Sequence, residues 1–559
     1  MATKTWDGGA FTSNWGDANN WSPNGVPGAS DDVTLVSSNG NSTLSINLNV
    51  NVSIKSLTIT GDDQGGSTHF TTLTVQSGKT LTTSGAINLS NSFSVITGAG
   101  TITAGAGISG SGTITASGGT LDVFGTINSG IGLTIGTSAN STLKIEGTAT
   151  ASSAISIGDP DQTLEIGPSG SLTINAAESI TSGTIKLSGG TLKDASGITI
   201  GSGAKLTGFG VIDTGTTVNG SGTITASGGT LEFKGAVDST GTASTFHIAS
   251  NSTLKFDNTV GTGSIKPTIA FDAATGTLDL SSMSGESSNF HGVVTSFKSG
   301  DQIKLTVASA GTETYTTSFS GGQTTLIIKQ GSTTVGTVVL QGDYRNAHFS
   351  IGESGTLDTI TTDAACFMAG TMIQTPNGGV AVEELKRGDL VLTSDGQVRP
   401  VSWLGVQTVS TRFADKMRVW PIRVLAGALE QNVPSRDLLL SPDHALLVEG
   451  ALVQAGALVN GTSILRETNV PEVFVYYHVE LDDHSLILAE NTPAETFVDN
   501  VDRLNFDNWA EYQELYPEGK PMTELSYPRA KAQRQVPVRT RITLAARAQA
   551  IGADATAVA

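Results

Sequence analysis

The part of the chain from residue 366 onward holds four residues whose types suit acyl-transfer chemistry. Cys366 is the only cysteine among 559 residues, so it cannot form an internal disulfide. Its thiolate would be a strong nucleophile, and an imidazole can transfer protons near neutral pH. Ser441 and His444 lie three residues apart in SPDHALLV, and His478 follows in YYHVELDDH. A lone cysteine is more often a small buried hydrophobic residue, so its sequence context must decide.

The residues around Cys366 supply that context. Ala364 and Ala365 precede it, and CFMAGTMIQTPNGGVAVEELKRGDLVLTSDG predicts a strand, a turn at TPNGG and a hairpin that begins at KRGD. This segment resembles the first sequence block of the Hint family, which includes hedgehog C-terminal domains, inteins and bacterial intein-like domains. The phrases AVEEL, RGDLV and RPVSWLG resemble the bacterial branch most. SPDHALLV resembles the second block and YYHVELDDHSLILAEN the penultimate block.

This resemblance runs from Cys366 to about Phe497 and implies an all-β, self-cleaving domain at residues 366–497. In such a domain the Cys366 thiol attacks the carbonyl carbon of Ala365 and forms a thioester through a tetrahedral intermediate. The resemblance implies that His444 protonates the departing amine as a general acid. Ser441 would orient the scissile carbonyl or amide, and His478 would activate the thiol or the incoming nucleophile. Water, a thiol or an amine would then accept the acyl group, with no cofactor and no metal.

Structural roles stay open for the polar residues of these blocks. Ser441 can simply cap a turn at Ser-Pro-Asp. Histidines are more often satisfied structural residues than catalysts, and we expect this of His484 in particular. Three motifs in the family's order, beginning at the only cysteine, favour the catalytic interpretation for Cys366 and His444.

The end of the segment departs from the pattern of splicing inteins, which finish in His-Asn. Glu495 and Thr496 occupy those two places. The pair Asn491-Thr492 resembles an intein end superficially, and C-terminal cleavage at this pair is the alternative. We therefore predict cleavage or transfer at the Ala365–Cys366 junction without splicing.

The residues before this segment form a repeat array. GSGTITASGGTL occurs at residues 110–121 and again, unchanged, at residues 220–231. Each unit is a short strand of alternating apolar and hydroxyl residues followed by a glycine turn, and such a unit cannot bury its apolar face alone. Stacked rungs of roughly 20 residues would form a continuous core, which predicts a right-handed parallel β-solenoid over residues 36–281. An array of β-sandwiches is the competing architecture.

Three further regions flank these two. Residues 1–35 predict an N-terminal cap whose tryptophans, Trp6, Trp15 and Trp21, cover the open end of the first rung, and a carbohydrate-stacking platform is the alternative. Residues 282–361 predict longer antiparallel strands that cap the other end of the solenoid. Residues 498–559 predict a helical or disordered tail. Its basic residues are expected to be solvated, and they are Arg529, Lys531, Arg534, Arg539 and Arg541.

Composition limits the partners and the compartment. The formal net charge of −19 leaves little positive charge to neutralise phosphates, which argues against nucleic-acid binding. Residues 1–25 contain no apolar core of a signal peptide, and no apolar run is long enough to span a membrane. Scarce cysteine suits exported bacterial repeat proteins and also cytosolic ones. We expect an extracellular or cell-surface protein without a cleavable N-terminal signal.

Three functions are compatible with this organisation. The first is an exported, autoprocessing protein whose solenoid is released at Cys366. The second is a surface adhesin, with a glycan or protein ligand of the solenoid and a catalytically degenerate C-terminal domain. The third is a polysaccharide-degrading β-helix, and it is disfavoured because the repeats offer no cluster of Asp, Arg or Lys in one groove.

Overall fold

The computed structural model describes most of the chain in two compact units. The first unit comprises Met1–Thr295, Lys304–Ser309 and Val335–Val339, and the second comprises Ser296–Ile303, Ala310–Thr334 and Leu340–Ala559. Strands make up 51% of the structure and helices 7%, which confirms the predicted all-β class. The described residues are 3–37, 43–64, 67–137, 139–273, 275–283, 289–298, 300–306, 313–344, 349–354, 357–362, 366–411, 419–496, 506–516, 525–530 and 533–552.

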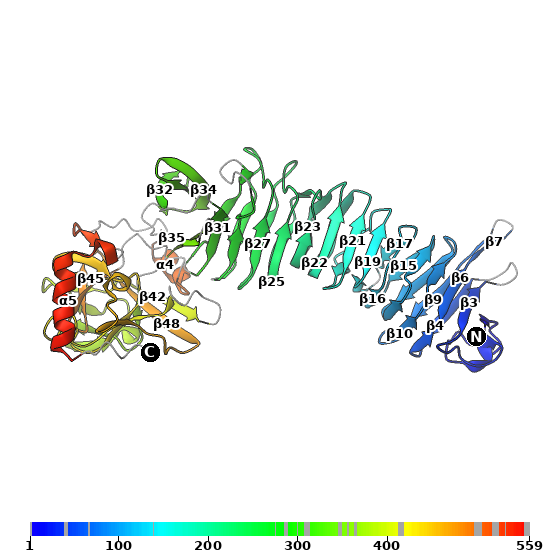
Figure 1. The fold of residues 1–559 in the computed structure, drawn as a ribbon, viewed down its shortest axis with the longest axis horizontal. Helices are drawn as coiled ribbons and strands as arrows, with labels where there is room; N and C mark the ends of the chain where they lie inside the picture. Colours follow the sequence, from blue (N-terminus) through cyan, green and yellow to red (C-terminus); the bar gives the residue numbers. More distant parts are fainter. Residues whose placement is uncertain are drawn as a thin grey trace. The chain divides into compact units, whose positions relative to one another are not determined.

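The first unit is a β-solenoid of about 12 turns, as the repeats predict (Figure 1). Its strands pair in parallel with the equivalent strand of the next rung, which a sandwich array would not do. One sheet runs through β3 (Asp32–Val36), β6 (Ser56–Thr60), β11 (Ile87–Leu89) and β14 (Ile108–Gly110). A second runs through β4 (Leu44–Leu48), β9 (Thr71–Val75), β12 (Ser94–Gly98), β15 (Thr113–Ala116) and β17 (Gly132–Ile135).

The two identical twelve-residue segments occupy equivalent places in the solenoid. The first spans β15 and the start of β16 (Thr120–Phe124), and the second lies largely in β25 (Thr223–Phe233). Each begins at a glycine with positive φ, and a Cβ there would lie 1.8 Å (Gly110) or 2.0 Å (Gly220) from a carbonyl oxygen of the preceding rung. Only glycine permits this approach, which explains its place in both copies.

The tryptophans near the N-terminus are core residues. Trp15 and Trp21 are fully buried, and their rings lie 4.6 Å apart between centroids. Trp6 packs on Trp21 at 5.1 Å, and β1 (Thr3–Trp6) continues the first sheet in parallel with β3. A carbohydrate platform requires exposed ring faces, so this burial supports a packing role for the three side chains.

Parallel stacking continues past residue 281, where the sequence pattern predicted its end. β28 (Thr268–Phe271) pairs in parallel with β30 (Val293–Thr295), and Val294 is buried in register with Ile269. The composition of the sequence therefore changes at residue 282, before strand pairing changes from parallel to antiparallel. Antiparallel pairs do follow, between β32 (Glu313–Ser320) and β33 (Gln323–Gln330), and between β35 (Phe349–Ser354) and β36 (Leu357–Thr362).

From Cys366 onward the chain forms a six-stranded sheet, a seven-stranded sheet and a two-stranded hairpin, and the described pairing is antiparallel except between β46 (Ala451–Gln454) and β51 (Arg529–Ala530). One large apolar core and two smaller apolar clusters hold them together. The predicted turn at TPNGG joins β38 (Met372–Thr375) to β39 (Gly378–Ala381). The six-stranded sheet contains β42 (Trp403–Ser410), β48 (Val473–Glu480), β37 (Phe367–Met368), β44 (Leu438–Leu440), β43 (Ile422–Val424) and β47 (Ile464–Arg466). The seven-stranded sheet contains β39, β38, β49 (Leu486–Ala489), β50 (Thr492–Glu495), β45 (Ala445–Val448), β46 and β51.

The described parts of the tail pack on this double sheet. α4 (Trp509–Leu515) and α5 (Val538–Ala550) are the helices that the sequence predicts after residue 498. Leu544 of α5 and Ala530 of β51 belong to the apolar core, and Thr540 donates a hydrogen bond to Glu449 at 2.7 Å. These segments are integral to the unit. No helix within the described ranges is long and apolar enough to cross a membrane.

Candidate functional site

Two hydrogen bonds join Cys366 and Ser441. Phe367 of β37 pairs with Leu440 of β44, which sets the residues before and after this pair opposite one another. The amide N–H of Cys366 donates to the Ser441 Oγ at 2.8 Å, and the N–H of Ser441 donates to the Cys366 carbonyl at 2.8 Å. The Cys366 nitrogen belongs to the predicted scissile bond, so Ser441 contacts the amide of that bond. Ala365 lies outside the described residues.

A tight turn brings His444 back to the same place. The His444 N–H donates to the Ser441 carbonyl at 3.2 Å, and the side chain is fully buried. Its Nε2 lies 3.0 Å from the main-chain carbonyl oxygen of Glu495 in β50. A carbonyl can only accept, so Nε2 carries the proton and the neutral ring has its lone pair on Nδ1. Among the described residues Nδ1 has no hydrogen-bond partner, and a buried polar atom in this state is a candidate for chemistry.

Burial shifts the proton affinity of both reactive groups. It lowers the pKa of His444, against the opposing influence of the Glu495 carboxylate and of the main chain at Cys366 and Glu495. It raises the pKa of the Cys366 thiol well above its ordinary value. At neutral pH the thiol is therefore protonated and the imidazole neutral, so His444 can accept a proton before it donates one.

The Cys366 thiol is enclosed by aromatic side chains. Trp403 and Tyr476 belong to its apolar cluster, together with Phe506 and Tyr512 of the C-terminal segment. The Trp403 ring lies 5.2 Å from Phe506 and 5.3 Å from Tyr512, between centroids. This cover excludes water, and electrostatic interactions are stronger in such a low-dielectric site.

The two remaining histidines of the predicted blocks occupy different places. His478 in β48 is buried, and its ring centroid lies 5.7 Å from that of His444. His484 instead accepts a hydrogen bond from the Leu525 N–H on Nδ1 at 3.0 Å, and its Nε2 faces the Glu495 Oε2 at 3.8 Å. The structure therefore brings His478 beside His444 and places His484 behind Glu495.

Sequence reasoning missed Glu495 at this site, and its expectation that Arg529 is solvated is wrong, because Arg529 pairs with the buried Glu495 carboxylate. Glu495 entered only as a departure from the intein ending, yet its buried carboxylate accepts the Ala445 N–H at 3.0 Å and pairs with the Arg529 Nη1 at 3.0 Å. Burial alone would raise the pKa of Glu495, but His484, Arg529 and His444 together hold it below its usual value. A glutamate at the position where splicing inteins carry a histidine was the available signal.

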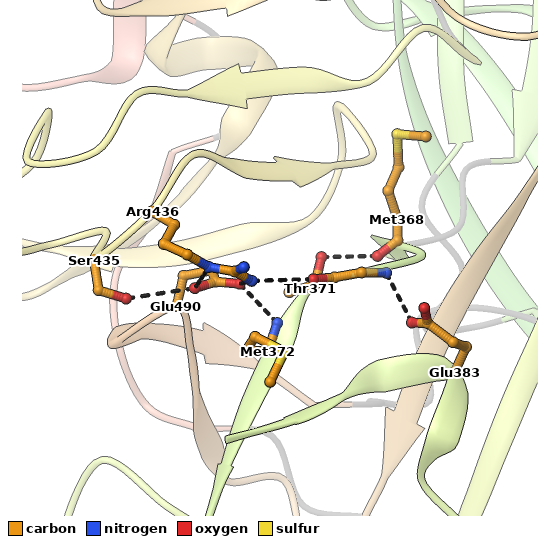
Figure 2. A network of polar contacts seen from close by, with 8 residues as sticks. Met368, Thr371, Met372, Glu383, Ser435, Arg436 and Glu490 are labelled. Atoms are coloured by element: carbon orange, nitrogen blue, oxygen red, sulfur yellow. Dashed lines mark hydrogen bonds and ion pairs between the residues drawn. The ribbon is translucent and has the colours of Figure 1, made fainter. Parts of the chain in front are cut away.

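A second ionic network holds the loop that follows Cys366 (Figure 2). The guanidinium of Arg436 binds the Glu490 carboxylate through Nε at 3.0 Å and Nη2 at 2.6 Å. The same carboxylate accepts the Met372 N–H at 2.7 Å, and Arg436 also donates to the Gly370 carbonyl at 3.2 Å. Glu383 accepts the Gly370 N–H at 2.7 Å. These contacts fix the start of β38 and hence the exit of the chain from the Cys366 pocket.

The sequence pair that resembles an intein end lies in a hairpin turn. Ala489 pairs with Thr492, and the two residues between them, Glu490 and Asn491, both have positive φ. The Asn491 side chain donates to the Asn432 carbonyl at 3.1 Å. This geometry is that of a two-residue β-hairpin turn, so Asn491 has a conformational role.

Within the described ranges no cluster of three or more His, Cys, Asp or Glu side chains could hold a metal ion.

Comparison with known proteins finds a family match for the part of the chain that contains Cys366. Residues 365–501 match the family model described as Hint domain. The match includes Cys366, Ser441, His444, His478 and Glu495, and it ends before β51 and α5. No curated protein and no solved structure matches the chain.

Proposed function

We propose that Cys366 cleaves the Ala365–Cys366 peptide bond through a thioester and frees the solenoid, because the chain carries a Hint domain that follows a β-solenoid in the sequence. The observation that carries the proposal is that Ser441 and His444 meet at one amide, that of Cys366. Ser441 binds the N–H of that amide, and the turn from Ser441 brings the buried Nδ1 of His444 to the same pocket.

The first step transfers the acyl group from nitrogen to sulfur. The Cys366 thiol gives its proton to the His444 Nδ1 while Sγ bonds to the Ala365 carbonyl carbon. The tetrahedral intermediate then collapses, the carbon–nitrogen bond breaks, and His444 returns that proton to the departing nitrogen. The products are a thioester between Ala365 and Sγ and a free α-amine on Cys366. One histidine serves both as base and as acid, which revises the purely acidic role that the sequence suggested.

The second step consumes the thioester. Water, a thiol or an amine attacks the acyl carbon, and Sγ leaves and regains a proton. His478 lies beside His444 and is proposed to assist this nucleophile. Splicing is not proposed, because Glu495 and Thr496 stand where an intein has His-Asn and because Asn491 lies in a turn.

The full-length chain and its Cys366→Ala variant test this proposal. Intact masses recorded over time, with and without dithiothreitol, should show the wild-type chain splitting into residues 1–365 and 366–559, faster with the added thiol. The alanine variant should stay intact under the same conditions. Cleavage of that variant would assign the cut to another protease, and an intact wild-type chain under every condition would remove the proposal.

One observation favours a second candidate function. Cys366 is fully buried in a cluster with five buried aromatic side chains, which limits the access of an external nucleophile to the thiol. A degenerate Hint domain would then serve as a stable end for an adhesive solenoid with a glycan or protein ligand. In that case solenoid binding to cells would be the same for the wild-type chain and for Cys366→Ala.

Export is part of the proposal in both cases. The long β-solenoid supports a location outside the cell or on its surface, whereas the near-absence of cysteine is compatible with both an exported and a cytosolic protein. Fractionation of the native producer, with immunodetection of the solenoid in medium, surface and cytoplasm, tests it, and an exclusively cytoplasmic signal would contradict it.

A further inference from the structure

We propose that Arg529, from the tail strand β51 beyond the Hint match, and Glu495 act together as positioning residues that stabilise the protonated form of His444 during cleavage. This inference rests on the proposed function, because it assigns the charge behind the proton-transfer residue of that reaction. Neither residue contacts the reacting atoms in this assignment. Both act through His444.

The tail strand is held in place by main-chain bonds. β51 pairs in parallel with β46, with Leu452 opposite Arg529, and the Leu452 N–H donates to the Pro528 carbonyl at 2.9 Å. Ala530 is buried in the apolar core of the domain. Backbone pairing therefore fixes the point from which the Arg529 side chain reaches the carboxylate of Glu495.

Glu495 meets His444 through both its main chain and its side chain. Its carbonyl oxygen lies 3.0 Å from the His444 Nε2, and its carboxylate accepts the N–H of Ala445, the next residue after His444. When the imidazole takes a proton on Nδ1 it becomes a buried cation. Because the His444 Nε2–H binds the main-chain carbonyl of Glu495, the Glu495 carboxylate stabilises that cation through space, by its negative charge.

The carboxylate can do this only while it is ionised. Glu495 is almost fully buried, and an unpaired carboxylate in such a place would bind a proton. Arg529 lies 3.0 Å from its Oε2. His484 also helps, because its Nδ1 accepts the Leu525 N–H, which leaves the ring proton on Nε2, toward the Glu495 Oε2. Both partners favour the charged form.

The charged and titratable groups that face His444 come from four elements. Cys366 precedes β37, His478 lies in β48, Glu495 ends β50, and Asp443 adjoins His444 in its own turn. Of the groups that influence the pKa of His444, Glu495 alone carries a full negative charge at neutral pH, and its effect is to raise that pKa against the effect of burial. Removing the negative charge should therefore lower the pKa of His444.

Nuclear magnetic resonance of ¹⁵N-histidine-labelled chains tests this without any cleavage. All variants carry Cys366→Ala, and the His444 signals are identified by their loss in His444→Asn. Glu495→Gln should lower the His444 titration midpoint by about one pH unit, equivalent to a tenfold change in proton affinity. Arg529→Met should lower it too, because Glu495 then takes up a proton. Arg529→Lys should keep the wild-type midpoint.

Glu490→Gln is the matched control. It also removes a buried carboxylate that is paired with an arginine and bound by a main-chain N–H, but its partners are Arg436 and Met372. Its His444 midpoint should equal that of the parent chain. An unchanged midpoint in Glu495→Gln would overturn the inference, and so would a higher midpoint in Arg529→Met, because Glu495 would then stay ionised without Arg529.

Cleavage kinetics give the second measurement. In chains that retain Cys366, Glu495→Gln should lower the plateau rate about tenfold and move the acidic limb of the rate–pH profile to lower pH. A lower rate with an unmoved limb would indicate only structural damage and would refute the assignment. If the wild-type chain does not cleave, the proposed function fails, while the His444 titration still decides the inference.

Discussion

The solenoid and the Hint domain bury titratable side chains in different ways. In the solenoid Glu178 and Asp238 are buried carboxylates that bind nearby main-chain groups: Glu178 accepts the Ile155 N–H at 2.7 Å, and Asp238 accepts the Ser244 N–H at 2.7 Å. In the Hint domain Cys366, His444 and Glu495 meet in one pocket, and His444 keeps one nitrogen without a described partner. Carboxylates that bind main-chain donors stabilise the solenoid, whereas the cysteine, histidine and glutamate that lie together in the Hint domain are arranged for the proposed proton transfer.

The largest expected effect separates histidines of the two regions. His444→Asn should slow cleavage by about 10²–10⁴-fold, because it removes the proton carrier. His247 of the solenoid is the matched control, since it is partly exposed and lies 2.7 Å from Asp272. His247→Asn should leave the rate unchanged. The cleavage rates are measured from intact masses of full-length chains. Equal rates for both variants would contradict the catalytic role of His444 and the structural role of His247.

The next effect concerns the backbone of the solenoid. A Cβ at Gly220 would lie 2.0 Å from the Ile200 carbonyl oxygen, and φ is 137° there. Gly220→Ala should destabilise the neighbouring rungs by about 2–4 kcal/mol. Gly118 also has positive φ but nothing within 4 Å of its Cβ position, so Gly118→Ala should cost only about 1 kcal/mol.

Hydrogen exchange of the rungs around each glycine measures this pair. Cleavage at Cys366 should proceed at the same rate in both variants, because the change lies in the other unit. Equal protection of the rungs in Gly220→Ala and in Gly118→Ala would show that the close carbonyl contact does not govern rung stability.

The smallest expected effect is a pH dependence of the solenoid. Burial raises the pKa of Glu178 from 4.5 to about 7. The folded state therefore keeps a proton that the unfolded chain releases, so the contribution to stability is full below about pH 4.5 and is lost as pH rises toward 7. Glu178→Gln should reduce this loss, which is on the order of 1–3 kcal/mol. Thermal unfolding at pH 5 and pH 7.5 measures it, and an unchanged pH dependence in the variant would exclude Glu178 as its source.

The sequence predicts more of the solenoid structure than of the residue contacts in the Hint domain. The solenoid follows from an exact repeat, since identical residues must meet identical surroundings in successive rungs, and Gly110 and Gly220 do so. The Hint domain follows from blocks that surround Cys366, Ser441 and His444. The pairing of Glu495 with Arg529 could not be predicted, because it joins residues 34 apart through a tail strand that has no periodic pattern.

Two further details of the site could not be predicted from the sequence and are seen only in the structure. Serine and histidine at a spacing of three did not reveal that Ser441 binds the amide nitrogen of Cys366, which depends on the register between β37 and β44. The tautomer of His444 depends on the carbonyl of a strand that lies 51 residues away in the chain. Local patterns predict which residues meet, but the direction of each hydrogen bond is set by long-range pairing.

Trapping with hydroxylamine tests the central claim most directly. The purified full-length chain is incubated with hydroxylamine at neutral pH, and the released N-terminal fragment is analysed by mass spectrometry. A Cys366 thioester predicts a fragment that ends at Ala365 as a hydroxamate, together with a second fragment that begins at Cys366 with a free thiol. A chain that stays intact, or a fragment that ends in a carboxylic acid at any other residue, would contradict the account.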